Sequence, residues 1–252
     1  MEYIKPELAQ EMPGLRLALT AGVPAPYSMS AKAILTLKQV DFVPVLQQGA
    51  GRNEELLAWT GHRNAPVAVY ADEAPRAGWL DILNLAERLG SGPPLLPENR
   101  DERMQMVAWA NELIGEDGWV WQLRLLMLGV GGPEKAAAAA QKNPMYAQYG
   151  YSEAALATAE AKARDTLQAF TAFAAQTSHP HYLIGERLSA LDIYWVFFSQ
   201  LADVLPHEQC PTPDGLRRSY EYSGQVIGGC DAALIERRNW VLTNHLTVPL
   251  DF

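Results

Sequence analysis

The first part of the chain alternates short strand-like runs with helix-like segments. Leu15–Leu19 alternates apolar and polar residues, which is typical of a half-buried strand. From Tyr27 onward, apolar residues recur every three or four positions, which predicts a helix that begins just after Pro26. Asp41–Leu46 and Asn53–Trp59 favour a second strand and a short second helix. The chain therefore opens in the order strand, helix, strand, helix.

A third strand is predicted at the apolar run Asn64–Tyr70, which contains a proline near its start. Proline has no N–H and is excluded from central strands, so Pro66 marks a strand start, an edge or a special turn. An X-Pro bond is also the common place for a cis peptide, which would leave the backbone groups of the preceding residue facing outward. A peptide-like molecule could bind those groups. A possible fourth strand at Arg76–Trp79 and a helix at Leu80–Leu89 would complete the order βαβαββα.

A segment dense in glycine and proline, Ser91–Pro97, is the best candidate for a linker. We expect an α/β domain at residues 1–92 and an all-helical domain at residues 98–252. The apolar tail Val248–Phe252 could pack back on the body of the protein.

The second region has helical character throughout. Ser189 and Asp192 have the spacing of a capping box at the start of the apolar run Ile193–Leu201. The other helical patterns cover Arg100–Met127, with possible interruptions at Gly115 and Gly118, then Ser152–Thr177 and Gln225–Leu246.

Composition and charge limit the partners. The chain has 252 residues, 20 Lys+Arg and 29 Asp+Glu, and its net charge of −9 argues against nucleic acid or an anionic membrane surface. No apolar run reaches the roughly 20 residues of a membrane span, and the start of the chain lacks a signal-peptide core. We therefore expect a cytoplasmic protein that binds small molecules. The two cysteines and five histidines predict no metal site, since only His179 and His181 are closely spaced and Pro180 between them favours a surface loop.

The order of elements and four motifs resemble the glutathione S-transferase family. The motifs occur in the order of the family and span nearly the whole chain. The resemblance implies a thioredoxin-like domain followed by a helical domain, glutathione as co-substrate, a small apolar electrophile as second substrate, and a homodimer. The motifs are Ala25-Pro26-Tyr27-Ser28, Asn64-Ala65-Pro66-Val67, Asp81-Ile82 and Gly185–Asp192.

The resemblance implies that the region of the third strand holds glutathione. In the family, the residue before a cis-proline offers its backbone N–H and C=O to the cysteinyl part, and here this residue is Ala65, followed by Pro66. Asn64 matches a position where a polar side chain lies close to the peptide. Asp81 would meet the γ-glutamyl ammonium, or would only stabilise the helix dipole. Ile82 replaces the usual serine, so only its backbone N–H could meet the γ-glutamyl carboxylate.

The thiol-activating residue departs from the family pattern. Many relatives place Ser or Cys where this chain has Ala25. Ser28, one helical turn later, is the candidate catalytic residue because its hydroxyl could donate to a bound sulfur, although it could also be a cap or a solvated hydroxyl. Thr20 and Tyr27 are weaker candidates. A non-catalytic module that binds a ligand or a protein is the alternative, which Ala25 and Ile82 favour.

An aromatic group near a predicted helix break has two interpretations. The family builds its acceptor pocket in this region, so the group could form a wall of that pocket. Aromatic clusters are also common in protein cores. The residues are Trp119, Trp121, Tyr146, Tyr149 and Tyr151.

Overall fold

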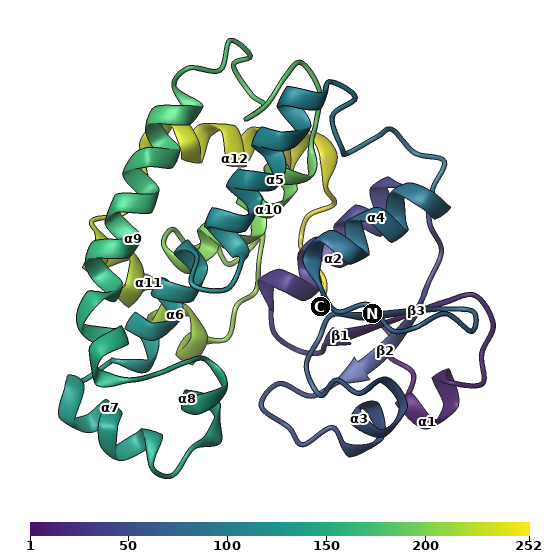
Figure 1. Ribbon diagram of the computed structural model, residues 1–252, viewed down its shortest axis with the longest axis horizontal. Helices are drawn as coiled ribbons and strands as arrows, with labels where there is room; N and C mark the ends of the chain where they lie inside the picture. The colour runs from purple at the N-terminus through teal and green to yellow at the C-terminus, as the bar shows by residue number, and fades with distance from the viewer. The chain divides into compact units, whose positions relative to one another are not determined.

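The computed structural model describes residues 1–252, except for the side chain of Pro144, and it separates into two compact units (Figure 1). Unit 1 is a mixed α/β body and unit 2 is helical. Unit 1 consists of Met1–Leu96, Glu208–Pro211 and Thr247–Phe252, and unit 2 consists of Pro97–His207 and Thr212–Leu246.

Unit 1 is built on a three-stranded sheet with the order β2-β1-β3. The central strand β1 (Leu15–Thr20) pairs in parallel with β2 (Val43–Gln47) and antiparallel with β3 (Val67–Tyr70). β1 is buried over its first five residues, as a central strand requires. Its one charged residue, Arg16, is buried but donates to the carbonyls of Gly14 and Ala71, so the charge keeps hydrogen-bond partners.

Helices cover both faces of this sheet (Figure 1). α2 (Pro26–Leu37) and α4 (Trp79–Leu89) lie on one face, and α1 (Pro6–Ala9) and α3 (Glu54–Thr60) lie on the other. Side chains alternate between the faces of a strand, so Ala18 packs in the cluster beneath α1 and α3 while its neighbours along β1 face the other way. The short helix α1 has no counterpart in the sequence prediction.

The predicted fourth strand at Arg76–Trp79 is wrong. Arg76 forms a single bridge to Ala68, with N–H···O distances of 2.8 and 2.9 Å. Gly78 is already the N-cap of α4 and Trp79 its first residue, so no length remains for a strand. The predicted thioredoxin-like arrangement is otherwise confirmed, with the last strand reduced to this bridge.

A buried lysine at the end of α2 bonds to the glycine- and proline-rich segment at the end of unit 1. The Lys38 ammonium is 3% exposed, pairs with the Glu87 carboxylate at 2.8 Å and also donates to the carbonyls of Gly92 and Pro93. The second oxygen of Glu87 accepts the N–H of Leu95 at 2.6 Å. One ion pair therefore joins α2, α4 and the glycine- and proline-rich segment.

The C-terminal tail also belongs to unit 1. The N–H of Leu250, a buried residue, donates to the Gln209 carbonyl at 2.7 Å. Lys32, in the middle of α2, bonds to both the carboxylate and the carbonyl of Asp251. The tail thus packs on the body, as its apolar sequence predicts.

Unit 2 contains only helices among its described residues. α10 is its most buried element, because all nine of its residues lie in the core. No helix of the described chain is long and apolar enough to cross a membrane. The elements are α5 (Arg100–Ile114), α6 (Trp119–Leu128), α7 (Pro133–Ala140), α8 (Pro144–Gln148), α9 (Glu153–Ala174), α10 (Ala190–Phe198), the 3-10 turn η1 (Ser199–Leu201), α11 (Asp214–Ile227) and α12 (Ala232–His245).

Two of the helical segments predicted for this unit each contain parts of two separate helices. The Arg100–Met127 pattern breaks between Ile114 and Trp119, at the two glycines noted above. The last helix predicted at Gln225–Leu246 is present as α12, but its predicted start is wrong, since α11 ends at Ile227 with the C-cap Gly228 at φ of +86° and α12 begins after the N-cap Asp231.

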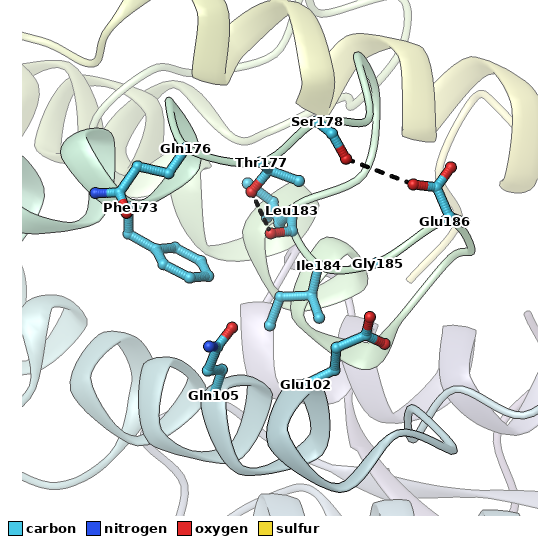
Figure 2. Close-up of a pocket in the computed structure, with 10 residues that line it drawn as sticks. All are labelled: Glu102, Gln105, Phe173, Gln176, Thr177, Ser178, Leu183, Ile184, Gly185 and Glu186. Atoms are coloured by element: carbon cyan, nitrogen blue, oxygen red, sulfur yellow. Dashed lines mark hydrogen bonds between the residues drawn. The ribbon is translucent and has the colours of Figure 1, made fainter.

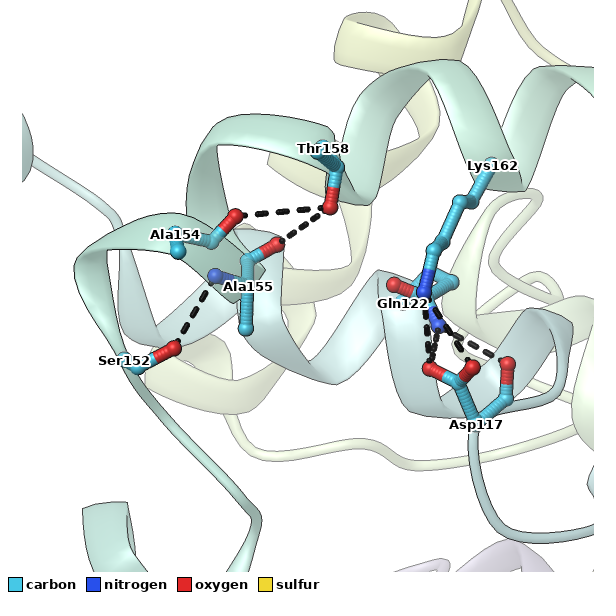
Figure 3. Close-up of polar contacts among 7 residues, drawn as sticks. All are labelled: Asp117, Gln122, Ser152, Ala154, Ala155, Thr158 and Lys162. Carbon is cyan, nitrogen blue, oxygen red and sulfur yellow. Dashed lines mark hydrogen bonds and ion pairs between the residues drawn. The ribbon is translucent and has the colours of Figure 1, made fainter.

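Polar side chains cap α9 and join it to the start of α6 (Figure 3). Ser152 caps the helix by accepting the N–H of Ala155 at 3.0 Å. Lys162 reaches from α9 to both carboxylate oxygens of Asp117, and Gln122 of α6 donates to the same carboxylate (Figure 3). Asp117 thereby ties the first turn of α6 to α9.

The predicted capping box of Ser189 and Asp192 is present at the start of α10. One Asp192 oxygen accepts from the Ser189 backbone N–H and hydroxyl, and the other accepts the Leu183 N–H at 2.8 Å. Burial, partly offset by these hydrogen bonds, raises the pKa of Asp192 from 3.8 to about 6. The capping box therefore also holds the preceding loop.

Replacing Lys38 with Met tests the ion pair of unit 1. The change leaves the Glu87 carboxylate without its cation in a largely buried site, so we expect the free energy of unfolding to fall by about 3 to 5 kcal/mol. Urea unfolding provides the measurement. Arg52→Met is the control, because Arg52 and its partner Glu54 are exposed, and we expect no measurable change there. Equal effects of the two substitutions would contradict the role given to Lys38.

The raised pKa of Asp192 gives a pH-dependent contribution to stability. Between about pH 4 and 6 the folded protein holds the Asp192 proton more tightly than the unfolded chain, so this contribution falls as the pH rises. A shift of about two pKa units corresponds to about 3 kcal/mol. We expect the stability advantage of the native protein over Asp192→Asn to shrink across this window in urea titrations. An advantage that is constant or grows with pH would rule out the shift.

Candidate functional site

The N-terminus of α2 lies next to the end of β1 in unit 1. Its N-cap is Ala25, which offers no side-chain acceptor, and its first turn contains no acidic residue. The N–H of Ser28, in the same turn, has no hydrogen-bond acceptor among the described residues. The positive end of this helix dipole is thus not compensated by its own cap, which favours an anion at this point.

Ser28 itself is buried and already bonded. Its side chain is 3% exposed, and its Oγ accepts the Thr20 backbone N–H at 3.1 Å and donates to Thr20 Oγ1 at 3.3 Å. The hydroxyl is therefore neither a helix cap nor solvated, the two alternatives that the sequence left open. In this structure it joins α2 to β1.

The hydrogen-bonded network continues beyond Thr20. Thr20 Oγ1 donates to Gln47 Oε1 at 2.8 Å, and Gln47 Nε2 donates to the carbonyls of Gln48 and Arg63 at 2.9 and 3.2 Å. Asn53 Nδ2 donates to the same two carbonyls. The end of β1, the end of β2 and the segment before β3 are thus held together by amide side chains.

Sequence reasoning missed both Gln47 and Asn53. Gln47 ends an apolar strand, where a polar residue looks like the start of a loop, yet its side chain is only 4% exposed. Asn53 was expected only as the first residue of a short helix, but it adopts φ of +48° and its side chain bonds across the loop. Asn at a turn is a signal for positive φ, although the bonding partners lie too far along the chain to be predicted.

The Ala65–Pro66 peptide is cis, and the backbone of Ala65 is unpaired. The pairing of β1 with β3 ends at Ala18 and Val67; if the register continued, it would set Thr20 opposite Ala65. The Thr20 N–H instead bonds to Ser28. Among the described residues, the N–H and C=O of Ala65 have no hydrogen-bond partner, so they can pair with a ligand. The Asn64 side chain is exposed beside them.

Asp81 lies in the first turn of α4 and is exposed. Its carboxylate folds back over the N-cap, since a Cβ added to Gly78 would lie 2.7 Å from Asp81 Oδ2. No ion pair or hydrogen bond to this carboxylate occurs within the described chain, so a cationic group could bind it.

The expectation for Ile82 needs correction. Its side chain is 1% exposed in the core, and its N–H donates to the Gly78 carbonyl at 3.0 Å inside α4. Because α4 begins at Trp79, the first-turn N–H groups of Leu80 and Asp81 are the ones without an acceptor in the described structure. A carboxylate at this helix start would therefore meet Leu80 or Asp81 rather than Ile82.

Unit 2 carries a cavity of about 350 Å³ between α5, the end of α9 and the loop before α10 (Figure 2). Glu102, Glu186 and Phe173 contribute to its lining, and Thr177 donates to the Leu183 carbonyl in its wall (Figure 2). None of the site residues expected from the sequence lines this cavity.

The aromatic group of unit 2 separates into core and surface members. Trp119 is fully buried and packs against Trp195 with ring centroids 5.6 Å apart. Trp121 meets the edge of Tyr149, and the Arg124 guanidinium lies 4.3 Å from the Tyr149 ring centroid. Of the two tryptophans, Trp121 alone is partly exposed and could contact a ligand.

Solved structures show which fold this is. No protein-family model matches the sequence, and no curated protein matches it significantly. A glutathione S-transferase from Xanthobacter autotrophicus Py2 superimposes with a TM-score of 0.58 at 17% identity, over 93% of this chain and 96% of that one. This chain has the glutathione S-transferase fold.

Two further structures with this fold were solved with glutathione or a derivative bound. A glutathione S-transferase from Methylobacterium radiotolerans JCM 2831, in complex with glutathione sulfonate, has a TM-score of 0.58 at 16% identity and covers 88% of this chain and 93% of its own. A maleylacetoacetate isomerase from Methylobacterium extorquens AM1, with bound malonate and glutathione, has a TM-score of 0.54 at 14% identity and covers 92% of this chain and 100% of its own. The fold thus spans both units.

Replacing Ser28 with Ala tests its structural link in this fold. The change removes the acceptor of the partly buried Thr20 N–H, so we expect the free energy of unfolding to fall by about 1 to 3 kcal/mol in urea titrations. Ser30→Ala is the matched control on the same helix, because the Ser30 hydroxyl only donates to the Tyr27 carbonyl one turn back. We expect a smaller loss there. A larger loss for Ser30→Ala would contradict the link.

Proposed function

We propose that this protein is a glutathione transferase-like enzyme that binds glutathione on unit 1 and uses it on a small apolar electrophile. The unpaired backbone of Ala65 before the cis Pro66 carries the proposal. An N–H and a C=O on one residue match the cysteinyl residue of glutathione, as in the addition of a strand. The exposed Asn64 side chain would contact the same tripeptide.

The start of α4 would bind the γ-glutamyl end. Its ammonium would pair with the free Asp81 carboxylate, and its carboxylate would accept from the N–H groups of Leu80 and Asp81 at the positive end of the helix dipole. The ammonium and the carboxylate of the γ-glutamyl residue would therefore each meet a protein group of complementary charge or hydrogen-bonding type.

The thiol would be activated by the N-terminus of α2. An uncompensated helix dipole and a free Ser28 N–H favour the thiolate over the thiol, as they do at reactive cysteines. The Ser28 hydroxyl stays a candidate donor to sulfur, but its proton would first have to leave Thr20. The thiolate would then attack the electrophile, and the sulfur–carbon bond would form as the leaving group departs with the bonding electrons.

The second substrate would bind to aromatic surface on unit 2. The partly exposed Trp121 and Tyr149 offer apolar surface on unit 2 that suits an apolar electrophile. A homodimer follows from the family resemblance alone. The rival is a non-catalytic module that binds glutathione or a protein, which the absence of a Ser or Cys at Ala25 favours.

Ultraviolet titration of the thiolate of bound glutathione tests the enzyme against the module. We expect binding at millimolar glutathione and a thiol pKa below that of free glutathione, because the α2 N-terminus stabilises the charged form. A bound thiol with an unshifted pKa would favour the module. No binding at millimolar glutathione would remove the proposal.

Asp81→Asn tests how glutathione is held. Losing the carboxylate leaves the γ-glutamyl ammonium unpaired, so we expect the dissociation constant measured by calorimetry to rise about tenfold, or about 1.4 kcal/mol. Asp72→Asn is the control, since Asp72 is equally exposed in unit 1 but lies outside a helix start. Equal losses would point to the net charge of the surface instead of a specific contact.

A further inference from the structure

We propose that Gln47 is a positioning residue that connects the two halves of the glutathione site; this inference rests on the proposed function. One half is the N-terminus of α2, reached through Thr20 and Ser28. The other half is the docking backbone at Ala65, reached through the carbonyl of Arg63 two residues before it.

The orientation of the Gln47 amide sets the direction of the bonds between the two hydroxyl groups of Thr20 and Ser28. Its Nε2 lies within 3.2 Å of two carbonyl oxygens, which can only accept, so the amide nitrogen faces them and Oε1 faces Thr20. Thr20 Oγ1 must therefore donate its proton to Gln47 Oε1. The lone pairs left on Thr20 Oγ1 accept the Ser28 proton.

This direction keeps the Ser28 proton away from a ligand. A serine hydroxyl carries one proton, and the Thr20 backbone N–H already occupies a lone pair of the same oxygen. As long as Gln47 accepts from Thr20, Thr20 Oγ1 keeps lone pairs for the Ser28 proton, and a sulfur at the helix start has to compete with Thr20 for that proton. Gln47 thus leaves the stabilisation of the thiolate to the backbone of α2.

The Nε2 group of Gln47 holds the backbone that leads to Ala65. The Arg63 carbonyl accepts from both Gln47 Nε2 and Asn53 Nδ2, at 3.2 and 3.1 Å. Arg63 is exposed, so these two amides are what holds its backbone to the body among the described residues. Fixing Arg63 limits the movement of Asn64 and Ala65, which must stay extended to pair with a peptide.

The two roles predict separable effects of three variants. Thr20→Val removes the acceptor of the Ser28 proton and leaves Arg63 untouched. Asn53→Gly removes one donor to Arg63 together with the bonds of Asn53 to Gln48 and Gly51, keeps the positive φ at low cost and leaves Thr20 untouched. Gln47→Met removes both effects of the side chain at once.

Two readouts follow the two halves separately. The thiol pKa of bound glutathione reports on the start of α2, and the affinity for S-methylglutathione, which has no thiol to ionise, reports on peptide docking. We expect Thr20→Val to lower the thiol pKa further by about one unit, because the released Ser28 proton can donate to the thiolate. We expect Asn53→Gly to weaken S-methylglutathione binding about tenfold without changing the thiol pKa. Gln47→Met should show both effects.

Two controls separate positioning from loss of stability. Adding Ser28→Ala to Thr20→Val or Gln47→Met must abolish the pKa change, since no hydroxyl remains to be released. Gln122→Met removes a second buried glutamine, in unit 2, and must leave both readouts unchanged even if it lowers stability.

Several outcomes would overturn the inference. A pKa change that persists without Ser28, or no change in Thr20→Val and Gln47→Met, would show that Gln47 does not direct the Ser28 proton. Unchanged S-methylglutathione affinity in Asn53→Gly and Gln47→Met would remove the second role. If Gln47→Met does not fold, Thr20→Val and Asn53→Gly still decide the two roles separately. Failure of the native protein to bind S-methylglutathione would instead refute the proposed function, and this inference with it.

Discussion

The hydrogen bond from the Thr20 N–H to Ser28 Oγ is the constraint on which the site depends. The pairing of β1 with β3 ends at Val67, which follows a proline, and the Thr20 N–H bonds to α2 instead of to Ala65, whose backbone has no partner among the described residues. The same bond sets the start of α2 beside the end of β1. The bond thus places the helix start, which Ala25 leaves without a side-chain cap, beside the strand end that precedes the unpaired backbone of Ala65.

At two positions where the sequence differs from the glutathione S-transferase motifs that it resembles, backbone groups offer the hydrogen bonds that a side chain would otherwise supply. Ala25 provides no hydroxyl, but the first-turn N–H groups and the dipole of α2 are properties of any helix start. Ile82 is a core residue of α4, while the N–H groups of Leu80 and Asp81, nearer the start of that helix, have no acceptor among the described residues. Backbone N–H groups at a helix start can bind an anion whichever side chain occupies these positions.

The sequence predicts elements whose signal is local. The alternation in Leu15–Leu19 and the proline before Val67 were sufficient for β1 and β3, and Ser189 with Asp192 was sufficient for the start of α10. Prediction from the sequence fails where a contact between residues far apart in the chain determines the structure. Arg76 forms only a two-bond bridge to Ala68 where a strand was predicted. Gln47 bonds to Thr20 and Arg63, which lie 27 and 16 residues away in the sequence. No periodicity carries that information.

The position of α2 is fixed at three points along its length, each by a polar contact. Ser28 bonds to β1 at the start, Lys32 to Asp251 of the tail in the middle, and Lys38 to Glu87 at the end. Directional bonds restrict rotation and sliding more than apolar packing does, because each requires particular atoms to meet. A helix held in this way presents its dipole in a set place before any ligand arrives. Electrostatic stabilisation of a thiolate depends on that preorganisation, since dipoles that must first turn toward a charge lose much of their effect.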